Sequence, residues 1–316
     1  MRATLVALSV LLASCAPSSS DEVVQPAGQS SWRSESPAPS ERTEVTATRL
    51  GRTIYVAGGF VPDGNTTTAR VDVYSIDDDT WTRGPRLPVA VNHAMSATVG
   101  GRAYVVGGFR GPGLSRPTRR ASVLRGGSWR RLPRMPAPRA AAAAVGMRGK
   151  LWVVGGVTGD GHARKTLVFD PDTRRWSRRP GLRVPRNHLG LARYRNRLYA
   201  VGGRAGAGNL DTFERYNPRR RRWKRLTAVP TERSGNGAAA TSSGLIVAVG
   251  GEGPDGTIGE VDAWDVGARR WRTLPDMPTP RHGLGVVSLG ADVFALSGGP
   301  EPGFAFSAAN EVLTVR

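Results

Sequence analysis

Residues 52–60 read RTIYVAGGF, an apolar run of strand-forming residues that ends in two adjacent glycines. A glycine inside a strand has no side chain to pack and loses much backbone entropy on folding, which costs about 0.5–1 kcal/mol relative to alanine. A similar sequence pattern recurs five times: AYVVGGF (103–109), LWVVGGV (151–157), LYAVGGR (198–204), LIVAVGGE (245–252) and VFALSGGP (293–300). The chain is therefore a repeat, and something in the repeated structure requires the bare backbone.

A second marker follows the same period. The first glycine of each pair stands at 58, 107, 155, 202, 250 and 298, and tryptophans stand at 32, 81, 129, 176, 223 and 271. Between them an apolar residue recurs, usually seven positions before the tryptophan: Tyr74, Phe169, Tyr216 and Trp264, with Leu124 five positions before in a shortened repeat. Three markers with one period of about 48 residues indicate a single supersecondary unit used six times.

This repeat resembles the kelch repeat, which forms one four-stranded blade of a β-propeller. The resemblance covers residues 32–316 and implies an all-β fold, a six-bladed kelch-type propeller. In the first full repeat we expect strands near 44–50, 53–57, 70–76 and 80–86, running from the central channel outward. The sixth glycine pair has no tryptophan after it, and Trp32 supplies the missing one. We therefore expect an N-terminal strand to complete the C-terminal blade and remove two free edges.

The N-terminus has the features of an export signal. Residues 3–13 (ATLVALSVLLA) form an apolar segment too short to span a membrane, and LASC at 12–15 resembles the bacterial lipobox. We expect a lipoprotein signal peptide at 1–14, a lipidated Cys15 followed by a flexible tether (15–31), and the propeller at 32–316. An ordinary secretory signal is the alternative, and both place the protein outside the cytoplasm, with the lipid form held at the cell membrane.

Composition supports this organisation. Glycine (41) and proline (23) are abundant, as in chains of many short strands and turns. Cys15 is the only cysteine, so no disulfide or thiolate metal cluster is expected. The net charge of +20 comes almost entirely from arginine, for which a GC-rich genome and selection for an anionic partner remain open explanations. Arginine clusters beside the repeat tryptophans would deter pairing of the outermost strands or meet an anionic envelope surface.

Five arginines share one register in the repeat. Ten residues after a repeat tryptophan stand Arg42, Arg139, Arg186, Arg233 and Arg281, and only Val91 departs. This turn leads into the innermost strand, so we expect the arginines to ring one mouth of the channel. In kelch domains that capture acidic peptides, arginines in this turn pair with ligand carboxylates, so the resemblance implies an anionic ligand here. The alternative role is bonding to carbonyl groups of adjacent turns.

Polar residues beside the arginines complete the candidate ligand-binding site: Asn92, His93, Asn187, His188, Asn236 and His282. His282 stands one position earlier in the repeat than His93 and His188, and alternating strand faces would point it elsewhere, so we expect no metal site. No cofactor is expected. The loops 61–70, 110–120 and 158–165 open at the same mouth and vary in length, as recognition loops do.

The first functional hypothesis is a lipid-anchored binding module that presents this mouth to an extracytoplasmic protein or glycan. The second is a sugar-acid mutarotase or epimerase of the sialic acid type, with Glu44 or Glu232 as acid or base beside an arginine. A copper radical oxidase is excluded, because Cys15 lies outside the propeller. A structural envelope component is a third hypothesis. We expect a monomer and no nucleic-acid partner.

Overall fold

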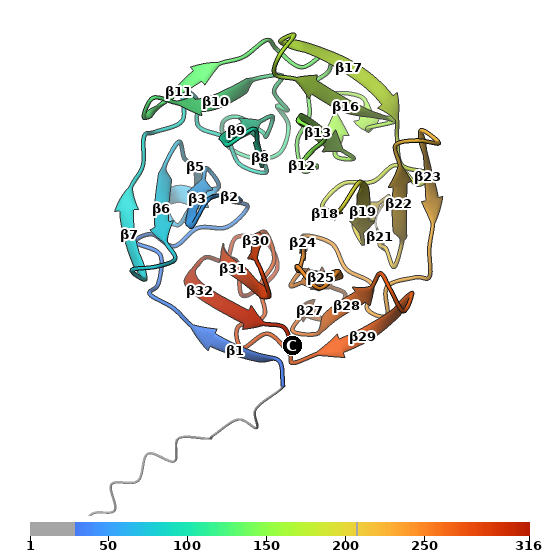
Figure 1. Cartoon of the computed structure of the whole chain (residues 1–316). Coiled ribbons are helices and arrows are strands. Elements are labelled where there is room, and N and C mark those ends of the chain that lie inside the picture. The colour runs from blue at the N-terminus through green and yellow to red at the C-terminus, as the bar shows by residue number, and fades with distance from the viewer. Residues whose placement is uncertain (1–28, 207) are drawn as a thin grey trace, which may run out of the picture.

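Each repeat folds into a four-stranded antiparallel sheet, and six such sheets surround a central channel (Figure 1). The computed structural model describes residues 29–206 and 208–316. The predicted signal peptide (1–14), Cys15 and the tether as far as residue 28 lie outside the described residues. The predictions of an all-β, six-bladed kelch-type propeller are confirmed.

The blades are numbered along the chain, and their strands are given from the channel outward. Blades one to three consist of β2 (Thr46–Leu50), β3 (Thr53–Ala57), β6 (Val71–Ser75) and β7 (Thr80–Arg83); β8 (Met95–Val99), β9 (Arg102–Val106), β10 (Ala121–Arg125) and β11 (Ser128–Arg131); and β12 (Ala143–Met147), β13 (Lys150–Val154), β16 (Lys165–Asp170) and β17 (Arg175–Pro180). Blades four to six consist of β18 (Gly190–Tyr194), β19 (Arg197–Val201), β22 (Phe213–Asn217) and β23 (Arg222–Arg225); β24 (Gly237–Ala240), β25 (Leu245–Val249), β28 (Val261–Asp265) and β29 (Arg270–Leu274); and β30 (Gly285–Leu289), β31 (Asp292–Gly298), β32 (Ser307–Thr314) and β1 (Ser31–Ser34).

The two ends of the channel differ. The segments that lead into the inner strands lie at one end, which we call the mouth, together with the loops 109–117 and 299–306 and four short hairpins. The turns that join the first strand to the second and the third to the fourth lie at the other end, which we call the far face. The hairpins are β4 (Phe60–Val61) with β5 (Thr66–Thr67), β14 (Val157–Thr158) with β15 (Gly161–His162), β20 (Arg204–Ala205) with β21 (Gly208–Asn209), and β26 (Glu252–Gly253) with β27 (Gly256–Thr257); the 3-10 helix η1 (Asp63–Asn65) joins the first pair.

The glycine pairs are where neighbouring blades touch. Gly58 has φ 67°, and a Cβ on it would collide with the carbonyl oxygen of Val91 in the next blade. The following residue, Gly59, donates its N–H to that same carbonyl at 2.9 Å. The close approach of two backbones, in a conformation that other residues rarely adopt, explains why both positions lack a side chain.

The sixth blade departs from this pattern by one residue. Gly298 donates to the carbonyl of Arg42 at 2.8 Å, so it takes the place of the second glycine, and Ser297 takes the place of the first with φ 56°. A shift in strand pairing between Leu296 and Gly298 causes the change. The functional pair is therefore Ser297 and Gly298, whereas the sequence had indicated Gly298 and Gly299.

The repeat tryptophans connect the blades at the outer rim. Each indole Nε1 donates to the carbonyl four residues after the preceding repeat tryptophan; Trp81 binds Ser36 and Trp129 binds Pro85, for example, at 2.8 and 2.9 Å. Trp32 closes the series by donating to Pro275 at 2.8 Å. Since β1 also pairs with β32, the predicted completion of the C-terminal blade by an N-terminal strand is confirmed.

The apolar core lies between adjacent blades. One cluster, for example, joins Tyr104 of β9 to Leu151 and Phe169 in blade three, and all three side chains are buried. This burial compensates for the glycines that the blade contacts require. None of the helices in the described part of the chain has the length and apolar character needed to cross a bilayer.

Candidate functional site at the channel mouth

The five arginines in register do not line the mouth as the sequence predicted. All five side chains are buried, with relative exposures of 0–2%. Arg42 binds the carboxylate of Asp72 at 2.8 Å, and Arg186 binds that of Glu214 at 2.7 Å. Arg233 with Asp262 and Arg281 with Glu311 repeat the arrangement. We therefore correct the prediction: each of these guanidinium groups binds within its own blade, in five of the six blades, and is not presented to a ligand.

The four carboxylate partners come from the third strands of their blades; Asp72 in VDVYS (71–75) and Asp262 in VDAWD (261–265), for example, lie among largely apolar residues. The same guanidinium groups also donate to backbone carbonyls, as Arg186 does to Gly202 at 2.6 Å. Burial lowers the pKa of Arg42 to about 10, so the side chain stays charged near neutral pH. Arg139 differs, because in the described residues it meets only the carbonyls of Gly155 and Lys165.

A ring of backbone hydrogen bonds surrounds the channel at the mouth. In blades two to six, the residue two positions after the arginine register donates its N–H to the equivalent carbonyl of the preceding blade: His93 to Glu44 at 3.0 Å and His188 to Ala141 at 2.8 Å, for example. Gly235 and Gly283 continue the ring. In blade one Val45 closes the ring by donating to Gly283 at 3.1 Å. Except for Val45, all of these residues have positive φ, and Glu44, His93, Ala141 and His188 do so without being glycine. Such backbone is uncommon for residues with a side chain, and it fixes where each side chain points.

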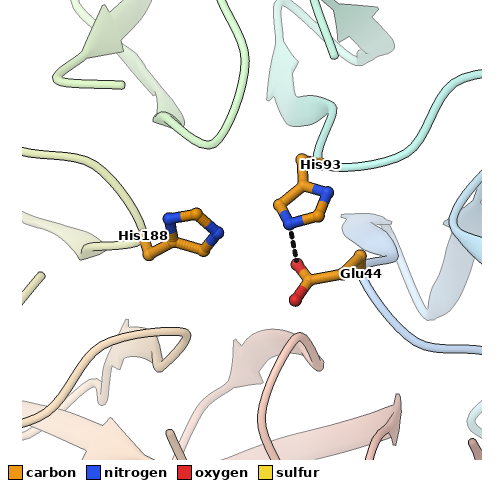
Figure 2. Close-up of side chains that lie close together, drawn as sticks. All are labelled: Glu44, His93 and His188. Carbon is orange, nitrogen blue, oxygen red and sulfur yellow. Dashed lines mark ion pairs between the residues drawn. The ribbon is translucent and has the colours of Figure 1, made fainter. Parts of the chain in front are cut away.

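Three side chains of this ring converge on the channel axis. Figure 2 shows Glu44, His93 and His188, which come from blades one, two and four and point toward one another. His93 Nε2 lies 3.0 Å from Glu44 Oε2, and the two imidazole rings are 5.0 Å apart, edge to face. The side-chain exposure is only 13% for Glu44 and 4% for His93.

His282 joins the cluster, contrary to the expectation that it would point elsewhere. Its Nδ1 lies 3.4 Å from Glu44 Oε1 and 4.0 Å from Glu252 Oε2, and its Nε2 lies 3.0 Å from the carbonyl of Glu301. The expectation was wrong because it applied strand alternation to residues that precede the inner strands and do not belong to them.

The predicted asparagines have separate roles. Asn92 and Asn187 each place their Oδ1 against Nδ1 of the histidine that follows, at 2.7 Å for Asn92. The Nδ2 of Asn92 donates to Thr67 at 2.8 Å, and that of Asn187 lies 2.7 Å from Nε2 of His162. Asn236 is buried, lines the same cavity as Glu44, His93 and His188, and donates its Nδ2–H to the carbonyl of Gly237. The predicted ligand-binding residues did not include Glu44. They also did not include His162, because the sequence of its loop does not show that the hairpin lies beside Asn187.

The charges of the cluster depend on each other. Burial alone would raise the pKa of Glu44, but His93 and His282 outweigh this effect and hold the pKa well below its ordinary value. Burial, with the neighbouring His93, lowers the pKa of His188 to about 3, so this ring is neutral near pH 7. For His282 burial acts to lower the pKa, but Glu44 and Glu252 together raise it above its ordinary value. The cluster therefore combines a carboxylate with at least one neutral imidazole.

A cavity of about 140 Å³ lies beside the ring, lined by the cluster and by small residues at the start of the inner strands, among them Ala94, Ala142 and Gly237. The small side chains leave room for water or for a narrow polar group. No large side chain therefore separates the cluster from the channel at this cavity.

Apolar side chains flank this polar centre. Leu114 and Phe304 are the large hydrophobic residues that are exposed in the described part of the chain, at 52% and 53%, and both lie on mouth loops. Phe304 packs edge to face on Phe60, with ring centroids 5.1 Å apart, and Thr67 Oγ1 donates to the carbonyl of Gly111 at 2.7 Å. These contacts join the mouth loops of blades six, one and two into one surface.

The mouth loops carry both signs of charge. In the connections between second and third strands, the partly or fully exposed charged residues are seven arginines and seven acids: Arg70, Arg110, Arg116, Arg119, Arg120, Arg164, Arg204, Asp63, Asp160, Asp211, Glu252, Asp255, Glu260 and Glu301. Arg204 and Glu252 form an ion pair at 3.3 Å. The excess of positive charge in the chain therefore lies elsewhere, and a ring of positive charge at the mouth is not found.

The fold and the mouth define a six-bladed kelch propeller, and the comparisons agree. The chain matches the KLHDC2/KLHL20/DRC7 Kelch-repeats domain over residues 136–299, more than half of its length, and the Kelch motif over 41–88. The chain belongs to this family of kelch-repeat domains.

Curated relatives match over short segments. "Kelch-like protein terF" of Aspergillus terreus is 41% identical over 71 residues (22% of this chain and 16% of the relative), and "F-box protein AFR" of Arabidopsis thaliana is 32% identical over 95 residues (30% and 26%). "Kelch-like protein 23" of Homo sapiens is 35% identical over 69 residues (22% and 12%). The match thus spans about a quarter or less of each relative's length.

Among solved structures, the propeller is similar to "Structure of YjhT", with a TM-score of 0.77 and 17% identity over 89% of this chain and 97% of that one. At this identity the likeness shows the shared fold.

Proposed function

We propose that the protein is a binding module that captures a segment of another protein at the mouth of its channel. The observation that carries this proposal is the position of Leu114 and Phe304, exposed apolar side chains whose loops contact the hairpin of blade one on either side. Phe60 of that hairpin also packs on His93 of the polar cluster, with ring centroids 6.1 Å apart. An apolar anchor beside oriented polar groups is the usual composition of a protein-recognition surface. The kelch fold in general serves this role.

The proposal no longer requires an anionic ligand. That expectation depended on open arginines, and four of the five have a carboxylate partner within the chain. The mutarotase hypothesis weakens for the same reason, because Arg42 and Arg233, the neighbours of Glu44 and Glu232, are buried. A glycan in place of a protein is an outcome that the following test distinguishes.

The test compares capture by tagged wild-type protein with capture by the double variant Leu114→Ser, Phe304→Ser. We expect the variant to lose about tenfold or more in affinity for an envelope protein that excess untagged wild type displaces, since exposed apolar anchors carry much of the binding energy at such surfaces. Arg220→Ser with Arg221→Ser on the far face is the matched control and should keep the capture. Equal capture by both double variants would contradict the proposal, and displacement by free oligosaccharide would replace the protein ligand with a glycan.

We also propose that the module is exported and held at the membrane through a lipid on Cys15, with the mouth turned away from the membrane. The supporting observation is that β1 begins on the far face, where Arg316 N–H binds Ser30 Oγ at 3.0 Å. The far-face turns of blades three to five carry exposed arginines, including Arg174, Arg175, Arg195 and Arg219–Arg222. Such a face complements anionic lipid headgroups.

For this anchor we expect the wild-type protein to incorporate labelled fatty acid in a host that processes lipoproteins, and the Cys15→Ser variant to incorporate none. The variant should also leave the membrane fraction, because the far-face charges alone give only weak, salt-sensitive attachment. Absence of label in the wild-type protein would show that the segment is an ordinary secretory signal.

A further inference from the structure

Two dipeptides at the mouth, Asn92-His93 and Asn187-His188, have one geometry in blades two and four. In each, the asparagine Oδ1 faces the histidine Nδ1. The Thr67 hydroxyl donates its proton to the carbonyl of Gly111, so it must accept from Asn92 Nδ2, and this assigns the amide oxygen of Asn92 to the imidazole. The Asn187 amide has the same orientation, with its Nδ2 facing Nε2 of His162. Each histidine therefore donates its Nδ1–H, and Nε2 is the ring nitrogen left to bind a ligand, which it does with its electron pair when it carries no proton.

Donating one ring N–H to a fixed acceptor is the arrangement that orients metal-ligating histidines. The backbone ring of the mouth adds to the rigidity, since both histidines have left-handed backbone fixed by hydrogen bonds between blades. The Nε2 atoms are thus aimed by the fold before any ligand arrives.

The donor atoms of Glu44, His93 and His188 all lie within 4.8 Å of one another. His93 Nε2 is 3.0 Å from a carboxylate oxygen of Glu44. So short a contact requires a positive charge between the two atoms, and either a proton on Nε2 or a bound metal ion supplies it. A divalent ion bound at about 2.0–2.2 Å from imidazole nitrogen and carboxylate oxygen would meet this requirement.

We propose that Glu44, His93 and His188 form a binding site for a divalent transition-metal ion of the zinc class at the mouth of the channel. Two histidines and one carboxylate are a donor set that zinc and iron(II) accept, with further coordination positions open. His282 is a positioning residue, because it contacts the second oxygen of Glu44 and keeps the carboxylate at the axis. This inference does not depend on the proposed protein ligand, although an open coordination position would let a partner's side chain bind the ion.

The test is equilibrium dialysis of the full chain against Zn²⁺, with metal content measured by mass spectrometry. We expect one equivalent per chain, and at least about tenfold weaker binding in each of Glu44→Gln, His93→Ala and His188→Ala. Glu232→Gln, which changes an exposed acid away from the cluster, is the matched control and should bind as the wild type does.

Thermal unfolding keeps the test valid if a variant is less stable. Metal-free wild type and His188→Gln should both melt cooperatively, and added Zn²⁺ should raise the melting temperature of the wild type alone, because a ligand stabilises only the state that binds it. Co²⁺ bound to the wild type should give the absorption bands of a nitrogen- and oxygen-ligated ion. Stoichiometric Zn²⁺ that persists in the double variant His93→Ala, His188→Ala would overturn the proposal. Failure of the wild type to bind Zn²⁺ below millimolar concentration would also overturn it.

Discussion

Arg186→Ala is expected to lower the free energy of unfolding by about 3–5 kcal/mol, the usual cost of removing one partner of a buried ion pair. Glu214 would keep a buried charge with no guanidinium beside it, since both side chains are fully buried. The carbonyls of Ala200 and Gly202 would lose their side-chain donor as well. Urea unfolding followed by circular dichroism measures the change.

Arg220→Ala is the control for this experiment, because Arg220 is exposed on a far-face turn and its loss should change the unfolding free energy by less than about 0.5 kcal/mol. The double variant Arg186→Met, Glu214→Leu should recover much of the lost stability, since it removes both charges together. If Arg186→Ala has the same free energy of unfolding as the wild type, the arginines in this register do not stabilise the blades. The earlier prediction that they bind a ligand would then be favoured again.

Deletion through Glu35 is expected to destabilise the propeller by at least about 3 kcal/mol, whereas deletion through Gly28 should leave the unfolding free energy nearly unchanged. The longer deletion removes β1, whose four residues pair with β32, and it removes the bond from Trp32 to Pro275. The exposed edge of β32 would also promote aggregation. Denaturant unfolding and light scattering of the two truncations measure these effects.

A synthetic peptide of residues 29–42 added to the longer truncation should restore part of the stability, because it can occupy the vacated edge. Equal stability of the two truncations would show that β1 does not close the ring.

The fold was predictable because every blade has the same contacts. The tryptophan indole reaches a carbonyl of the neighbouring blade, and the glycine backbone touches the next one, so both must recur with the period of the blade. Closure followed from Trp32 alone. Only the sixth glycine pair was assigned wrongly. The shift in strand register that puts Ser297 in place of the first glycine cannot be recognised in the sequence.

The site was less predictable, because its members come from separate blades. The sequence showed the arginine register but not its burial, although the acids Asp72, Glu214, Asp262 and Glu311 on the third strands of the same blades were a signal for it. The meeting of Glu44 with His93, His188 and His282 depends on the positive φ of the ring at the mouth, and residue spacing alone does not give that direction.

The central claim is that this protein makes its specific contacts at the mouth of the channel. It is tested most directly by photo-crosslinking in intact cells of the source organism, with a photoreactive amino acid placed in turn at Leu114, at Phe304 and, on the far face, at Arg220. The account predicts one protein adduct shared by the two mouth positions, which free wild-type propeller displaces, and only lipid adducts at Arg220. The same protein adduct at Arg220, with none at Leu114 or Phe304, would contradict it.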